Sequence, residues 1–73
     1  MRLPSLKSGQ VVKVLIRLGF EKIRQTGSHL ILVHKGSKKI TPVPIHNKNL
    51  KRGLLRSIIK QTGLTVKEFL NLL

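Results

Sequence analysis

The chain has 73 residues, no cysteine, and 15 Lys and Arg against two acidic residues, which gives a formal net charge of +13. A domain of this size buries only about 60% of the surface of its unfolded chain, so we expect one domain over residues 1–73 without a large enclosed cofactor cavity. The absence of cysteine excludes disulfides, thiolate metal sites and cysteine nucleophiles. No apolar run approaches the roughly 20 residues of a membrane span and no cleavable signal precedes the first element, so we expect a cytoplasmic protein.

The N-terminal part predicts a helix followed by a strand. Ser8 can cap a helix over residues 8–18, in which apolar residues recur at helical spacing. Gly19 follows as a residue that can take the left-handed conformation and end the helix. Residues 20–25 alternate loosely between apolar and polar types, and we interpret them as the first strand.

Two further strands are expected after a turn. Residues 29–34 form an apolar run of strand length, and residues 39–45 predict another strand after a second turn. Pro42 and Pro44 lack N–H donors on the same side of this last strand, as suits a strand at the edge of a sheet. We therefore expect a three-stranded antiparallel sheet in the order 1-2-3, with the third strand outermost.

The C-terminal part predicts two helices. The first ends at Gly63 and has an apolar stripe made of Leu54, Leu55, Ile58 and Ile59. Thr65 and Glu68 have the spacing of a capping box, which begins a short helix over 65–72 that contributes Val66, Phe69, Leu70 and Leu73 to the core. The order α-β-β-β-α-α predicts an α+β fold in which the helices cover one face of the sheet and leave the other accessible.

The charge points to a polyanionic partner. Between Lys22 and Lys67 there are eleven basic residues and no acid. Nucleic acid is the first candidate partner, an acidic protein the second and an anionic membrane a distant third, with a generic basic surface as the plain alternative. The chain has no Trp or Tyr, and Phe20 and Phe69 lie in apolar contexts, so contact with the nucleic-acid backbone is favoured over base stacking.

The scarcity of acids limits the chemistry. Glu21 and Glu68 are the only carboxylates and Glu68 is expected to cap a helix, which excludes paired-carboxylate and two-metal mechanisms. His29 and His34 are an odd number of residues apart in one strand and face opposite sides, which argues against a zinc site with His46. Histidine and cations remain, with no metal or cofactor. An imidazole can deprotonate an RNA 2′-hydroxyl, which attacks the adjacent phosphorus while Lys or Arg stabilises the developing charge.

The register of the second hairpin decides which histidines meet. A turn around Gly36 places His29 opposite Ile45, and a register one residue longer places it opposite His46. In both cases the two histidines are expected near one corner of the sheet, with His34 near the other end. A lone strand histidine is usually structural, so the pattern alone leaves the role of all three open.

Several segments resemble the HicA toxin family in their order and spacing, although none of them is specific by itself. They are Leu18-Gly19-Phe20, Gly27-Ser28-His29, Val43-Pro44-Ile45-His46, the stretch 53–65 and Glu68-Phe69-Leu70. The resemblance covers roughly residues 5–72. Pro42 stands where family members often carry a β-branched residue, a change that is compatible with an edge strand.

The resemblance implies a fold like that of double-stranded-RNA-binding domains, α-β-β-β-α with a short extra C-terminal helix. It also implies a toxin that arrests growth by cleaving mRNA as a metal-independent endoribonuclease, and a HicB-type antitoxin that neutralises it. The catalytic histidine of the family falls on His29, with Gly27, Ser28 and His46 as supporting candidates. Phosphate contacts are expected from basic side chains, for which the candidates are Lys22, Arg24, Lys48, Lys51 and Arg56.

Two other classes of function stay open. One is a non-catalytic basic RNA-binding module, because double-stranded RNA is recognised mainly by shape and backbone. The other is an interaction protein whose function is to be bound by an acidic partner.

Overall fold

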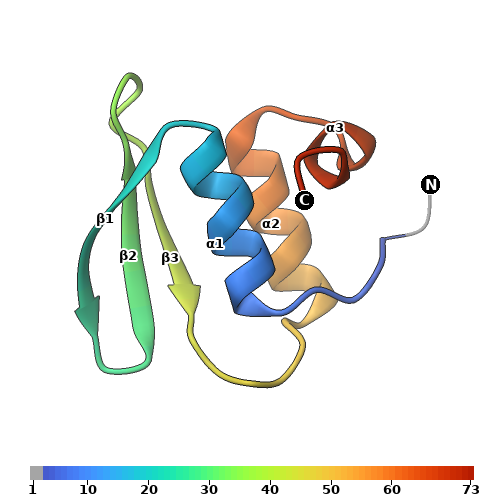
Figure 1. The fold of residues 1–73 in the computed structure, drawn as a ribbon, viewed down its shortest axis with the longest axis horizontal. Coiled ribbons are helices and arrows are strands. Elements are labelled where there is room, and N and C mark those ends of the chain that lie inside the picture. The colour runs from blue at the N-terminus through green and yellow to red at the C-terminus, as the bar shows by residue number, and fades with distance from the viewer. Residues whose placement is uncertain (1–2) are drawn as a thin grey trace.

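The computed structural model describes residues 3–73. Its elements follow the predicted order (Figure 1): α1 (Ser8–Arg17), β1 (Phe20–Thr26), β2 (His29–His34), β3 (Ile40–Pro44), α2 (Arg52–Thr62) and α3 (Val66–Leu70). The α+β class is confirmed. Within the described part of the chain, no helix combines the length and the apolar character needed to cross a bilayer.

Helix α1 starts differently from the prediction. Its N-cap residue is Lys7, whose backbone N–H donates to Gln10 Oε1 at 2.9 Å. Ser8 is buried, and its hydroxyl donates to the backbone carbonyl of His46 at 3.1 Å. The prediction that Ser8 caps the helix is therefore wrong, because a tertiary partner takes its hydroxyl. Gly19 has a φ of 100°, so the predicted left-handed residue after the helix is confirmed.

The sheet has the predicted order β1-β2-β3, all antiparallel. The backbone N–H of Ile45 donates to the carbonyl of Ser28. Because successive N–H groups of a strand point to opposite sides, Pro42 and Pro44 turn their donor-free nitrogens away from β2. The third strand is thus an edge strand that cannot pair regularly with another strand, as predicted.

The register of the second hairpin differs from both predicted registers, by one residue from the first and by two residues from the second. His29 lies opposite Pro44, not opposite Ile45 or His46. The cause is a four-residue loop, 35–38, whose last residue is a lysine with a φ of 64°. A glycine in a sequence indicates a position that can be left-handed, whereas a lysine gives no such indication. The sequence therefore predicted a shorter loop than the structure has.

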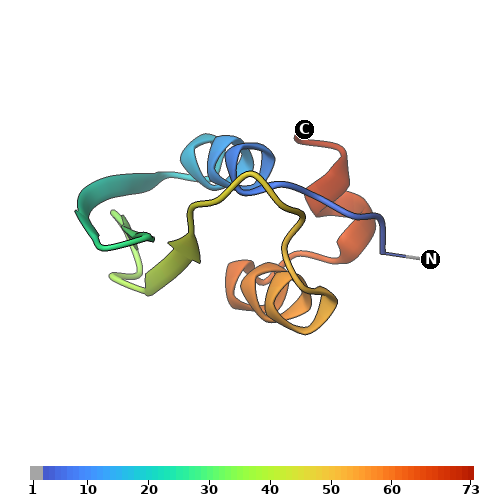
Figure 2. The same ribbon diagram turned by 90° about the horizontal axis from the view of Figure 1, so that it is seen from below.

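The core lies between the inner face of the sheet and the helices, which are gathered at one side of it (Figures 1 and 2). Its largest side chains with less than 2% exposure come from all three helices and from β2, namely Leu15, Leu32, Leu55 and Phe69. Two residues predicted to be buried are not: Leu54 is 36% exposed and Leu73 is 41% exposed. Leu73 lies beyond the end of α3, which is shorter than the predicted helix over 65–72.

The predicted capping box at the start of α3 is confirmed. The Glu68 N–H donates to Thr65 Oγ1 at 3.2 Å, and the Thr65 N–H donates to Glu68 Oε1 at 2.9 Å. The carboxylate of Glu68 is therefore engaged in a local structural role.

His34 joins the end of α1 to the second hairpin. Its Nδ1 accepts the N–H groups of Gly36 and Ser37, both at 3.1 Å, so its proton is on Nε2, which donates to the carbonyl of Leu18 at 2.9 Å. The ring also packs edge-on against Phe20, with centroids 5.0 Å apart. All polar atoms of this imidazole are thus used to hold the fold together.

We expect the substitution His34→Ala to lower the free energy of unfolding by about 2–3 kcal/mol, from three lost hydrogen bonds and one aromatic contact. The matched control is His29→Ala, because the exposed His29 ring has no hydrogen-bond partner within residues 3–73. This control should change the free energy of unfolding by less than about 0.5 kcal/mol. Urea unfolding followed by circular dichroism measures both, and equal losses would contradict the structural role of His34.

Candidate functional site

His29 is the first residue of β2 and stands directly after a tight turn. Thr26 and His29 face each other across the hairpin, which leaves Gly27 and Ser28 as a two-residue loop. Gly27 has a φ of 59° while Ser28 is not left-handed, which is the sign pattern of a type II′ turn. The Ser28 carbonyl accepts the N–H of Ile45 from β3. The backbone that carries His29 is therefore fixed on both sides.

A β-bulge in β1 decides which side chains share a face with His29. Lys22 pairs with Leu32 and Arg24 pairs with Ile31, so one extra residue is inserted between them. Leu32 is buried in the core, and side chains that face each other across a pair point to the same side. Lys22 therefore lies on the inner face of the sheet, whereas Arg24 lies on the outer face with His29.

The outer face is open in both views of the fold (Figures 1 and 2), with no helix across it. Ile40 at this face is 60% exposed. Arg24 is diagonal to His29, since its partner Ile31 is two residues further along β2. Diagonal Cα atoms on neighbouring strands are about 7–8 Å apart, within reach of a long side chain. A phosphate bound at His29 is thus accessible to the guanidinium of Arg24.

His46 is held in the segment that follows β3. Its Nδ1 accepts the N–H of Lys48 at 3.2 Å, and its carbonyl accepts the hydroxyl of Ser8. It lies two residues beyond Pro44, the partner of His29, so the register does not set the two histidines opposite each other.

The five predicted phosphate-binding side chains are all exposed but do not form one cluster. Arg24 shares the outer face with His29, and Lys22 lies on the opposite face. The other three belong to the segment after β3 and to α2, and are Lys48, Lys51 and Arg56. The sheet therefore brings only Arg24 of these residues to the His29 face.

Both carboxylates of the chain have partners. Glu21 Oε1 lies 2.9 Å from Lys35 Nζ, an exposed ion pair, and Glu68 belongs to the capping box. Neither is placed with His29, so the geometry favours an imidazole and cations as the reacting groups.

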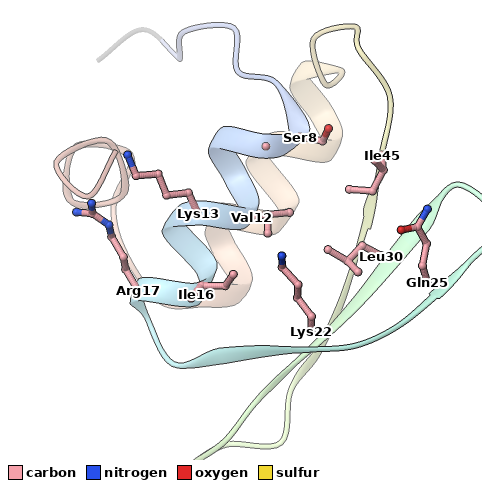
Figure 3. Close-up of a pocket in the computed structure, with 10 residues that line it drawn as sticks. Ser8, Val12, Lys13, Ile16, Arg17, Lys22, Gln25, Leu30 and Ile45 are labelled. Carbon is pink, nitrogen blue, oxygen red and sulfur yellow. The ribbon is translucent and has the colours of Figure 1, made fainter.

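One feature of the described chain escaped the sequence analysis. An open groove lies between α1 and the inner face of the sheet (Figure 3), and the strand pairing places His29 on the other face. Ile16, one of the apolar residues of α1, is 45% exposed at this groove. The apolar spacing of α1 indicates which residues share a face of the helix. It does not indicate that part of this face, at Ile16, is left without a packing partner on the sheet.

The fold and the site define a small, strongly basic α+β domain with an open sheet face that carries a histidine and an arginine. A family model described as the HicA toxin of bacterial toxin–antitoxin systems matches residues 8–64. The chain therefore belongs to the HicA toxin family, as the resemblance indicated, and it is the toxin of a pair that includes an antitoxin partner. A search of curated proteins found no match.

The conformation of the His29 turn can be tested with two glycine substitutions. At Gly27 an added Cβ would meet no atom within 4 Å, so Gly27→Ala tests backbone strain alone. We expect it to cost about 1–2 kcal/mol of unfolding free energy, and Gly27→Asn to cost less. The control Gly53→Ala, in helix α2 and equally free of contacts, should stabilise by about 0.5–1 kcal/mol. Urea unfolding measures each variant, and a neutral Gly27→Ala would contradict the assigned turn.

Proposed function

We propose that this toxin is an mRNA interferase, a metal-independent endoribonuclease in which His29 is the general base or general acid. The observation that carries the proposal is the state of the three imidazoles. Both ring nitrogens of His34 and one of His46 have backbone partners, whereas within residues 3–73 both ring nitrogens of His29 are without one. His29 is also exposed, at the end of the central strand on the outer face of the sheet, so an RNA chain can reach it without entering a pocket.

The chemistry needs an imidazole, a cation and a proton donor for the leaving oxygen, which can be water. His29 takes the proton of a 2′-hydroxyl, and the 2′-oxygen forms a bond to the adjacent phosphorus. The bond from phosphorus to the 5′-oxygen breaks, and that oxygen leaves with a proton from an acid or from water. The products are a 2′,3′-cyclic phosphate and a 5′-hydroxyl. Arg24 stabilises the negative charge on the phosphoryl oxygens as it develops.

The remaining residues position these groups and the substrate. Gly27 and Ser28 fix the backbone before His29, and the cations beyond the sheet, Lys48, Lys51 and Arg56, extend the contact with phosphates. The net charge of +13 suits a polyanionic substrate, and mRNA as substrate implies action in the cytoplasm. The antitoxin is proposed to be of the HicB type and acidic.

The role of His29 is tested with purified protein and labelled RNA in EDTA. His29→Ala and His29→Gln should lower the cleavage rate at least about a hundredfold, the usual contribution of general acid–base catalysis, while RNA binding changes less than about twofold. His46→Ala and a substrate with 2′-deoxyribose at the cut site serve as controls. Intact RNA at saturating wild-type protein would favour the non-catalytic RNA-binding module, and cleavage of the deoxy substrate would exclude the mechanism.

A second test concerns the face of the sheet. Arg24→Ala should lower the cleavage rate about tenfold or more, because it removes a cation beside the reacting phosphate. Lys67→Ala removes the same charge from helix α3, outside the sheet, and should change the rate less than about twofold. Equal losses would mean that only the total charge matters and that Arg24 is not at the reacting centre.

A further inference from the structure

The groove between α1 and the sheet is a second candidate binding surface, on the face opposite to His29 (Figure 3). It is open and has a volume of roughly 700 Å³. Its apolar lining comes from two sides: Val12 and Ile16 on α1, and Leu30 and Ile45 on the strand side. Of these side chains Ile16 is 45% exposed, so a bound segment can bury it against the partly buried Leu30 and Ile45.

The charges around the groove have a single sign. Figure 3 shows Lys22 pointing from β1 towards α1, into the space between the two apolar sides. Lys13 and Arg17 line the groove on α1, and no carboxylate lines it. The ion pair found within residues 3–73 joins Lys35 to Glu21, so the ammonium of Lys22 has no protein counter-ion there. The groove therefore attracts a ligand that carries negative charge.

The side chains that line the groove favour an acidic peptide over RNA as its ligand. Contact with an RNA backbone gains nothing from an aliphatic lining, and the groove has no aromatic side chain on which a base could stack. Aliphatic side chains, in contrast, gain free energy by burying against Val12, Ile16 and Leu30 without needing a specific ring geometry. The combination favours a peptide segment with both aliphatic and acidic side chains over RNA.

We propose that this groove binds an acidic, aliphatic segment of the antitoxin, with a carboxylate of that segment paired to Lys22. The proposal rests on the antitoxin partnership of the family and not on RNA cleavage. It assigns the anchoring of the antitoxin to the inner face and α1, whereas His29 and Arg24 lie on the outer face. Variants of His29 should accordingly retain the antitoxin.

The absence of cysteine allows a direct test by thiol protection. Single cysteines are introduced as Gln25→Cys in the groove and Val33→Cys on the outer face, each together with His29→Ala. The antitoxin encoded beside the toxin gene should slow the reaction of the Gln25→Cys thiol with a maleimide at least about tenfold. An RNA oligonucleotide in place of the antitoxin should leave this thiol reactive.

Three results would overturn the proposal: protection by the antitoxin at Val33→Cys alone, protection at neither position, or protection of Gln25→Cys by the oligonucleotide. The last would assign the groove to RNA. Because all variants lack His29, the outcome does not depend on whether His29 cleaves RNA.

The paired charge is tested by reversing it. Lys22→Glu should weaken binding of the same antitoxin about tenfold or more, because the reversed charge repels the carboxylate of the bound segment. Lys67→Glu makes the same change in net charge on α3 and should weaken binding much less. Equal effects of the two variants would show that the antitoxin responds to total charge and has no contact with Lys22.

Discussion

The burial of Leu32 in the central strand fixes the faces on which the other residues of β2 lie. Side chains alternate along a strand, so the inward position of Leu32 directs Leu30 and His34 towards the helices and turns His29 outwards. A slip of one residue would exchange these two sets, placing an imidazole that has no partner in the core. The candidate catalytic group is therefore exposed because its neighbours in β2 must be buried.

The same strand explains why two residues close in sequence have different surroundings. Without the bulge in β1, Lys22 and Arg24 would point to one face, since they are two residues apart. Because one extra residue is inserted between them, the side chain of Arg24 points to the outer face and that of Gln25 points to the inner face. Composition and alternation carry no signal for such an insertion, because it depends on how β1 and β2 pair over their full length.

Local features of this fold were predictable from the sequence, whereas long-range ones were less so. The capping box of Thr65 and Glu68 and the edge position of the proline strand depend on residues within one element, and both are confirmed. The prediction that Ser8 caps α1 was wrong, because its hydroxyl donates to the backbone carbonyl of His46, far along the chain. The predicted register of the second hairpin was wrong because the left-handed conformation of Lys38 could not be foreseen from the sequence. For the site, the sequence indicated His29 and a basic surface, but it did not separate the two faces or indicate the groove.

The net charge of +13 is consistent with anionic partners on both faces of the sheet. Fifteen cations on a domain with one ion pair among its described residues repel one another, and anionic partners relieve this repulsion. RNA at the outer face and an acidic segment in the groove would both do so without competing for the same side chains.

The separation of the two faces also limits how the antitoxin can inhibit. At physiological ionic strength the Debye length is about 8 Å, so charges further apart than this are largely screened. A carboxylate at Lys22 and a phosphate at His29 are separated by the sheet and by two side chains that point in opposite directions. Charge in the groove alone would therefore change RNA affinity little. An antitoxin anchored there must extend to the other side of the sheet to cover His29, and it cannot do so by regular strand pairing along β3, whose outer edge lacks N–H donors at Pro42 and Pro44.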